Sequence, residues 1–220
     1  MILYTKDNLP ENLNWASHLL EKKQIFLDEY LNYKKVIQTK YPVVAKHLNN
    51  MINCPLIKAF SVPLFTMNRP LRDRQGGEGY YNGICAPTYQ MTPEEKSYIK
   101  YEDILKVMFD FCYFSEDDLS YLFKESLSLV IDNVPKLWQA MIIEFKPGTR
   151  FDPHVHEKFY LSSFNLNQAD KYMEIQAEGH SVNLCEEEPL LVFDSSYEHI
   201  AIEKGNKNRI LLVIGSEFQT

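Results

Sequence analysis

Residues 190–214 read LLVFDSSYEHIAIEKGNKNRILLVI, a stretch in which apolar runs alternate with turn-forming segments. The runs Leu190–Phe193, His199–Ile202 and Arg209–Ile214 have the length and the Leu, Ile and Val content of short β-strands. Residues 203–208 contain Gly and Asn between charged residues, so they predict a turn that joins the second and third runs in a hairpin.

Four runs upstream have the same character. They are Leu137–Lys146, Phe159–Leu166, Tyr172–Gln176 and Ser181–Leu184. Seven short strands so close together in sequence, separated by turn residues, are typical of a β-sandwich or a small barrel.

The first half of the chain indicates helices. Apolar residues recur at helical spacing from Glu11 to Lys40, and Tyr41-Pro42 ends this segment because the residue before proline disfavours helical backbone. A shorter helix is predicted over 43–51. Two further helix starts have capping residues, Thr92-Pro93-Glu94-Glu95 and Ser115-Glu116-Asp117-Asp118.

The two halves form one unit in this interpretation, because no flexible linker separates them. We predict a single domain, 1–220, of the α+β class. Residues 1–133 are expected to be mainly helical and loop-rich, and to pack against a β-barrel catalytic core, 134–220.

Residues 54–90 contain several prolines and the glycine-rich run 76–79, which indicates loop structure. The segment is too long for a plain connector, so it either carries short strands or forms a functional lid. As a lid it would present three arginines and two tyrosines to a substrate, and as the alternative it is a solvated surface loop. These residues are Arg69, Arg72, Arg74, Tyr80 and Tyr81.

Composition excludes several classes of protein. The net charge of −7 argues against nucleic acid as the main partner, since phosphate binding requires clustered cations. No apolar run has the roughly 20 residues that span a bilayer. The four cysteines form no CxxC pair and the first residues do not resemble a signal peptide, so we expect a cytoplasmic protein with reduced thiols.

Three histidines of the β region are candidate metal ligands. His154 and His156 form a His-x-His pair, and residues two apart in a strand point to the same face, so both rings could face a barrel mouth. His199 lies 45 residues after His154. Imidazoles on separate strands of one barrel can bind iron or a similar metal and leave positions open. His180, alone beside Gly179, is interpreted as a surface residue.

The stretch from Val134 to Glu217 resembles the aspartyl/asparaginyl β-hydroxylase group of iron(II)- and 2-oxoglutarate-dependent dioxygenases. Four pieces carry the resemblance: Ala140–Phe145 running into Lys146-Pro147-Gly148-Thr149, then Pro153-His154, Leu191–His199, and Asn208–Val213. The resemblance implies a double-stranded β-helix, a jelly-roll or cupin-like barrel, with the N-terminal helices packed against it.

The resemblance also implies roles for individual residues. His154 and His199 match the family's two iron-binding histidines, and Arg209 matches the arginine that binds the 5-carboxylate of 2-oxoglutarate. Such a guanidinium forms paired, charge-assisted hydrogen bonds with a carboxylate. The alternative for Arg209 is a surface arginine that closes a hairpin. Ser163 stands where the family tends to have a histidine that helps to hold the cosubstrate.

The chain departs from the family pattern at His156, where an Asp or a Gly is usual. His156 is either a third metal ligand or a solvent-facing residue, in which case water or Asp152 completes the ligand set. A second resemblance agrees with His156 as a third metal ligand: Gly148 followed by His-x-His is similar to the first cupin motif. The glutamate of that motif is missing, since Glu157 comes too early.

The leading functional hypothesis is an Fe(II)/2-oxoglutarate-dependent hydroxylase that acts on an amino acid, a peptide or protein side chain, or a small metabolite. Its metal ligands would be His154, His156 and His199, with Arg209 and Ser163 binding the cosubstrate. The alternatives are a three-histidine cupin-type oxygenase that uses no 2-oxoglutarate, and a non-enzymatic metal-binding barrel. We expect a small-molecule or peptide substrate and no nucleic-acid or membrane partner.

Overall fold

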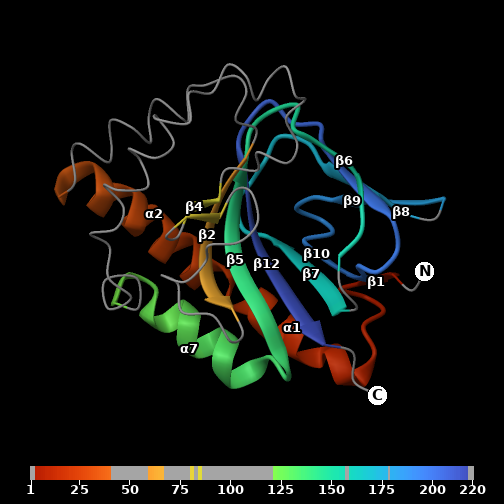
Figure 1. The fold of residues 1–220 in the computed structure, drawn as a ribbon, viewed down its shortest axis with the longest axis horizontal. Coiled ribbons are helices and arrows are strands. Elements are labelled where there is room, and N and C mark those ends of the chain that lie inside the picture. Colours follow the sequence, from red (N-terminus) through yellow and green to blue (C-terminus); the bar gives the residue numbers. More distant parts are fainter. Residues whose placement is uncertain are drawn as a thin grey trace.

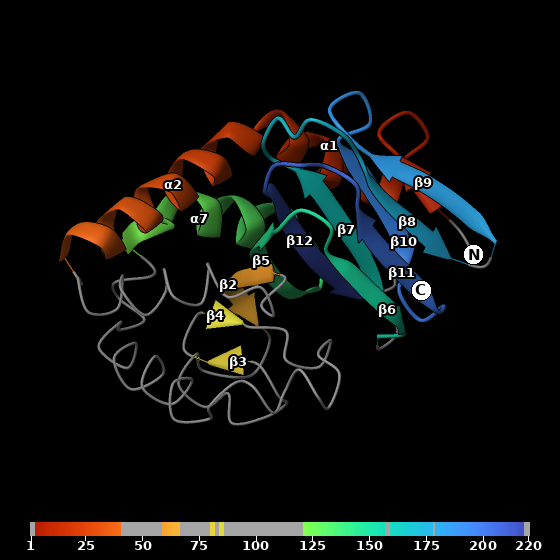
Figure 2. The ribbon, with the colours of Figure 1, turned by 90° about the horizontal axis from the view of Figure 1, so that it is seen from above.

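The computed structural model describes residues 3–40, 59–66, 80–81, 84–85, 121–156, 159–177 and 179–217. In these ranges of the chain, two antiparallel β-sheets face each other, and three helices lie on one side of them (Figures 1 and 2). The predicted helix over 43–51, the two capped helix starts at Thr92 and Ser115, and the three arginines of the predicted lid lie outside the described residues.

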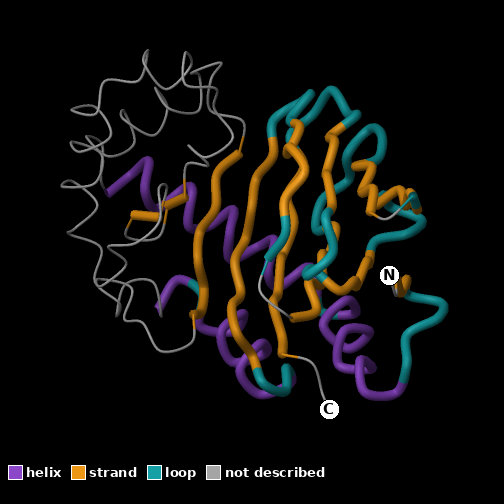
Figure 3. The backbone as a smooth tube through the Cα atoms, turned by 45° about the vertical axis from the view of Figure 1, so that its right-hand side comes forward, coloured by secondary structure: helices purple, strands orange, loops and turns teal. Residues whose placement is uncertain are grey.

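The larger sheet has eight strands. In spatial order they are β1 (Leu3–Thr5), β10 (Leu190–Asp194), β7 (Phe159–Asn165), β12 (Arg209–Glu217), β5 (Leu137–Phe145), β2 (Ala59–Thr66), β4 (Ile84–Cys85) and β3 (Tyr80–Tyr81). Its long strands run side by side in Figure 3. The smaller sheet has four strands, in the order β6 (Arg150–His154), β11 (His199–Glu203), β8 (Met173–Ala177) and β9 (His180–Leu184).

From β5 to β12 the chain passes repeatedly between the two sheets. Strands β5, β7, β10 and β12 belong to the larger sheet, whereas β6, β8, β9 and β11 belong to the smaller one. This alternation is the topology of a double-stranded β-helix. The predicted α+β fold with a cupin-like barrel is therefore confirmed.

The predicted strands agree with the observed ones to within a few residues, but five described strands were not among them. Strand β6 was missed, and β1, β2, β3 and β4 come from the region that was predicted to be helical and loop-rich. Strand β2 pairs with β5 over residues 59–66, so the larger sheet extends across the predicted boundary at 133/134. The segment 54–90 therefore carries short strands, which was one of its two interpretations.

The helices cover the outer face of the larger sheet, the face turned away from the smaller sheet (Figure 2). They are α1 (Asn14–Glu21), α2 (Lys23–Lys40) and α7 (Lys124–Asn133), and a short 3-10 turn (Glu11–Leu13) precedes α1. The predicted helix from Glu11 to Lys40 is thus present, with a break at Lys22. Within the described residues, no helix combines the length and the apolar character needed to cross a membrane.

Two apolar cores hold these layers together. The outer core lies between the helices and the larger sheet, and includes Leu19, Phe26, Phe123, Ile142 and Leu212. The inner core lies between the two sheets, and includes Met141, Met173, Leu191, Phe193 and Leu211. Strand β12 contributes to both and is buried from Arg209 to Ser216. A strand covered on both faces has a continuous apolar sequence, which explains the run Ile210–Ile214.

A buried carboxylate ties helix α2 to the larger sheet. Glu144 of β5 accepts hydrogen bonds from the Tyr30 hydroxyl (2.7 Å), the Lys34 ammonium (2.8 Å) and the Asn208 amide (2.7 Å). Burial alone would raise the pKa of Glu144, but the charge of Lys34 and the three hydrogen bonds outweigh it, and the pKa lies below its ordinary value. The carboxylate is therefore charged in the folded protein and satisfied by its partners.

We predict that Glu144→Gln lowers the free energy of unfolding by about 1–3 kcal/mol, because the amide removes the charge that Lys34 faces and replaces one acceptor oxygen. Urea denaturation followed by circular dichroism measures this change. The matched control is Asp28→Asn, which alters an exposed carboxylate on α2, the helix that Glu144 anchors, and should change stability by less than about 0.5 kcal/mol. Equal stability of the Glu144 variant and the wild type would contradict the anchoring role.

Candidate metal centre

An irregularity in β6 determines which side chains face the inside of the barrel. His199 of β11 lies opposite His154, whereas Ala201 lies opposite Phe151, so two residues on β11 span three on β6. A bulge of this kind turns residues three apart to the same face, although they would face opposite sides of a regular strand. Phe151 and His154 consequently lie on one side, with their ring centroids 6.2 Å apart.

The three candidate histidines come together at one end of the barrel. The ring centroids of His154 and His199 are 4.3 Å apart, those of His154 and His156 4.9 Å, and those of His156 and His199 5.2 Å. One ring nitrogen from each residue lies within 4.8 Å of the others. Nitrogens that share one ion at about 2.1 Å lie within about 4.2 Å of one another, so small side-chain rotations would close the set.

Burial differs among the three rings and gives the cluster an open side. His199 is 4% exposed, His154 is half-buried, and His156, which follows the end of β6, is exposed. On the inner side, the ring of Phe193 lies 4.9 Å from His199 in an edge-on arrangement. Two exposed apolar residues are close to the histidines in sequence: Val155, between His154 and His156, is 58% exposed, and Tyr197, two residues before His199, is 38% exposed.

The tautomer of His199 follows from its hydrogen bond. Its Nδ1 atom lies 2.9 Å from the carbonyl oxygen of Tyr197. A carbonyl can only accept a hydrogen bond, so Nδ1 carries the proton and Nε2 has a free lone pair. A ligand histidine in metalloproteins usually has such a partner on its second nitrogen, which fixes the ring and the tautomer.

Electrostatics keep two of the rings neutral. Burial lowers the pKa of His199 to about 4, against the opposing effect of the Tyr197 carbonyl and with a contribution from His154. Although His156 is exposed as a whole residue, the protein atoms around its ring displace water, and this desolvation, together with the proximity of His154 and His199, lowers its pKa to about 4 as well. Neutral imidazole is the form that binds metals, so these two rings are ready for a metal at neutral pH.

The turn between β10 and β11, which leads into His199, also contacts His156 through a backbone hydrogen bond. The backbone N–H of His156 donates to the carbonyl of Ser195 at 2.9 Å. Asp194 Oδ1 accepts from the backbone N–H of Ser196 at 2.9 Å and from its hydroxyl at 2.6 Å. Sequence reasoning missed Asp194, although an Asp followed two residues later by Ser after a strand is a recognisable turn signal.

Ser163 does not belong to the histidine cluster. It faces the inner core in the middle of β7, opposite Leu191 of β10 and Val213 of β12. Phe193, which contacts His199, is two residues further along β10 than Leu191. Ser163 therefore lies one layer of side chains deeper than the histidines, and its predicted role in cosubstrate binding stays a prediction.

Arg209 lies at the other end of the barrel and is fully buried. Its Nε donates to Glu203 Oε2, with which it forms an ion pair, and one Nη also reaches Glu203 Oε1 at 3.3 Å. The two Nη atoms further donate to the Asn165 side chain (2.8 Å) and the Lys171 carbonyl (2.6 Å). Glu203 ends β11 at the opposite end from His199, which separates Arg209 from the histidines.

This arrangement bears on the predicted role of Arg209 in binding 2-oxoglutarate, which stays a prediction. The guanidinium is already neutralised by Glu203 and makes four hydrogen bonds to protein atoms. A keto-acid carboxylate would have to displace Glu203, which would leave a charged group buried without its partner. The predicted hairpin is wrong, because β11 pairs with β6 and β8 of the smaller sheet and β12 with β5 and β7 of the larger one, so the turn 203–208 carries the chain between the sheets. Sequence reasoning missed Glu203, which begins this turn, as the partner of Arg209, which follows it.

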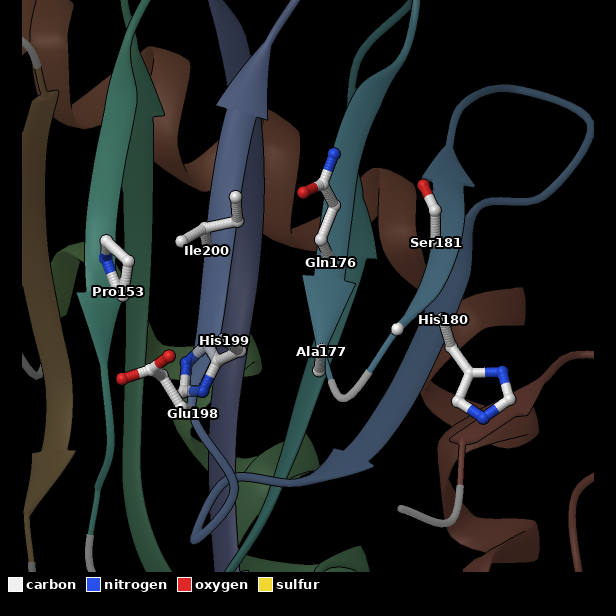
Figure 4. A pocket seen from close by; sticks show the side chains of 9 residues that line it. Pro153, Gln176, Ala177, His180, Ser181, Glu198, His199 and Ile200 are labelled. Carbon is white, nitrogen blue, oxygen red and sulfur yellow. The ribbon is translucent and has the colours of Figure 1, made fainter.

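A groove of about 430 Å³ crosses the four strands of the smaller sheet beside His199. Gln176, Ile200 and Ser181 line it from neighbouring strands, and Glu198 lies at its rim in Figure 4. His180, which was interpreted as a surface residue, is exposed; it also lines the groove, although its ring points away from these side chains in Figure 4. His199 lines the groove as well, so the groove adjoins the histidine cluster.

The donor set favours a metal that accepts imidazole. Within the described residues the cluster contains three histidines and no carboxylate. The side chain of Asp152, the alternative ligand, is not among the side chains that the structure describes. Imidazole ligands suit iron, zinc, copper and nickel, whereas magnesium and calcium require oxygen ligands. Three ligands on one side of an ion leave its other positions open to small molecules.

We predict that Arg209→Met lowers the free energy of unfolding by about 3–5 kcal/mol, because Glu203 is left charged and buried. The double variant Arg209→Met with Glu203→Leu should recover at least half of that loss, since both charges are then removed. Urea denaturation of the metal-free protein measures both changes. A loss below about 1 kcal/mol in the single variant would contradict a structural ion pair.

We predict that the rings of His156 and His199 stay neutral in the metal-free protein when the pH falls from about 7 to about 5, since an ordinary histidine titrates near 6.5. Histidine side-chain NMR measures the protonation of each ring. The unfolded chain takes up these protons first, so the stability of the metal-free protein should fall as the pH drops from 6.5 towards about 4. A midpoint near 6.5 for either ring would contradict the prediction.

No family model and no curated protein matches the sequence. Among solved structures, the chain is similar to KdgF from Halomonas sp., with 20% identity and a TM-score of 0.31 over 39% of this chain and 74% of that one. It is also similar to a predicted oxalate decarboxylase from Thermotoga maritima, with 18% identity and a TM-score of 0.34 over 41% of this chain and 74% of that one.

A third similar structure is the cupin domain of a transcriptional regulator from Enterobacter cloacae, with 13% identity and a TM-score of 0.33 over 38% of this chain and 84% of that one. These likenesses concern the fold of about two fifths of the chain. The kinship with aspartyl/asparaginyl β-hydroxylases gains no support from them and stays a prediction. The strand order itself gives this chain a cupin-like fold.

Proposed function

We propose that the protein is a metal-dependent, cupin-type oxygenase that binds Fe(II) through His154, His156 and His199 and uses no 2-oxoglutarate. The observation that carries the proposal is the convergence of three imidazoles at the open end of the barrel. The engagement of Arg209 by Glu203 at the other end supports the second half of the proposal.

A bound ferrous ion would supply the affinity for O2 that amino-acid side chains lack. The chain's own role is to hold the ion and shape its surroundings. His199 is fixed by the Tyr197 carbonyl, and Phe193 lies against its ring on the inner side. The apolar inner core keeps water away from that side, so substrates approach from the side where His156 is exposed.

The open side suggests the character of the substrate. Val155 and Tyr197 are exposed beside the ligand residues, and exposed apolar side chains at a site commonly contact a ligand. We therefore expect a small organic molecule or a side chain with an apolar portion next to the atoms that meet the metal. The groove with Glu198 and Gln176 offers polar contacts to the remainder of such a substrate.

Two other functions remain as hypotheses from the sequence. The block from Leu191 to His199 with the Asn-Arg strand start resembles 2-oxoglutarate-dependent hydroxylases, and that resemblance is independent of the partners of Arg209. A metal-binding barrel without catalytic activity would have the same three ligands. The three hypotheses differ in what the iron-loaded protein binds next.

The test is anaerobic reconstitution of the full chain with Fe(II), followed by separate additions of nitric oxide and 2-oxoglutarate. Nitric oxide is an O2 substitute that gives a characteristic electron paramagnetic resonance signal when it binds Fe(II) at an open position. We expect this signal with one iron per chain, and no visible metal-to-ligand absorption band on addition of 2-oxoglutarate. His199→Ala should lose the stoichiometric iron and the signal.

The matched control is His180→Ala, which removes an exposed histidine near the site and should leave iron binding unchanged. A visible band with 2-oxoglutarate that disappears in Arg209→Lys would establish the hydroxylase hypothesis in place of ours. Iron binding without any nitric oxide signal would indicate a closed, non-catalytic site. Failure to bind iron at all would exclude the metal centre.

A further inference from the structure

We infer that Asp194 is a positioning residue for the metal centre, acting on His156 through the peptide group between Ser195 and Ser196. This inference rests on the proposed metal site and concerns how its most exposed ligand is held. Asp194 is not a candidate ligand, because the cluster of possible ligand atoms contains only the three histidines among the described residues.

One planar peptide group connects the two residues. Its N–H, on Ser196, donates to Asp194 Oδ1 at 2.9 Å, and its C=O, on Ser195, accepts from the backbone N–H of His156 at 2.9 Å. The C=O and N–H of a trans peptide point in opposite directions and cannot rotate independently. A carboxylate that holds the N–H therefore also directs the C=O at His156.

A second hydrogen bond fixes the orientation of the carboxylate itself. Asp194 Oδ1 also accepts from the Ser196 hydroxyl at 2.6 Å, so the same oxygen holds the backbone and the side chain of one residue. Asp194 ends strand β10 and pairs with Tyr160 of β7, which places it on the rigid larger sheet. The restraint on His156 thus originates in the sheet and not in the turn.

His156 needs such a restraint more than the other two histidines do. His154 ends β6 opposite His199, and both are held by the pairing of β6 with β11. His156 follows the end of β6 and is exposed, so strand pairing does not hold it. Residues that orient metal ligands typically change metal affinity by about 10- to 100-fold when they are removed.

The experiment measures the dissociation constant of Co(II), a spectroscopic substitute for Fe(II), in the full chain and in variants of it. We expect Asp194→Ala to weaken Co(II) binding at least about 10-fold and Asp194→Asn to stay within about 3-fold of wild type, since the Asn carbonyl oxygen still accepts both hydrogen bonds. The visible spectrum of bound Co(II) should report one lost nitrogen ligand in Asp194→Ala, as in His156→Ala.

A double variant separates positioning from general destabilisation. If Asp194 acts through His156, Asp194→Ala should cause no further loss of affinity in a protein that already carries His156→Ala. The matched control is Asp170→Ala, which removes another carboxylate that accepts from turn backbone, at Asn206 and Lys207 near the opposite end of the barrel. It should leave Co(II) affinity unchanged.

Three results would overturn the inference. Wild-type affinity in Asp194→Ala would overturn it alone, provided that His199→Ala still abolishes binding. Equal losses in Asp194→Ala with and without His156 would also overturn it, since the effect would then not pass through His156. Absence of Co(II) binding by the wild-type chain would overturn the metal centre and this inference together.

Discussion

Strand β12 has no solvent-exposed face along most of its length, and the arrangement of the other layers depends on this constraint. Its side chains alternate between the outer core under the helices and the inner core between the sheets. A central strand of this kind requires cover on both sides, so the helices and the smaller sheet are both needed for folding. The division begins where the strand starts: Asn208, just before β12, donates to Glu144 on the helix side, and Arg209, its first residue, pairs with Glu203 between the sheets.

The five residues of strand β11 have a candidate metal ligand at one end and a buried ion pair at the other. His199 at its start belongs to the histidine cluster, and Glu203 at its end belongs to a buried ion pair. Alternate residues of a strand share a face, so Ala201 between them also points inward and keeps the two groups apart. Arg209 and Glu203 neutralise each other's charge, whereas the three histidine rings can bind an external cation.

Apart from β6, the strands after residue 136 could be predicted because turn residues bound each apolar run. Strand β2 could not, since Pro63 is typical of a loop and the pairing with β5 is distant in sequence. The sequence identified the three histidines, but their convergence depends on a bulge in β6 that no spacing rule predicts. The role predicted for Arg209 came from a resemblance in the sequence around it. The carboxylate that it meets, Glu203, becomes its partner only when the two sheets pack face to face.

The ion pair of Arg209 and Glu203 fills the barrel at the end opposite the histidines. Gly205 allows close packing at this end, because a Cβ atom there would lie 2.7 Å from Glu203 Oε1 and 2.8 Å from Asp170 Oδ1. An organic molecule bound over the exposed side of the three histidines would cover an ion held by them, so the ion would have to be loaded first. The occupant nearest the mouth then governs how fast the ion can escape, so a slowly released product would protect the metal from chelators.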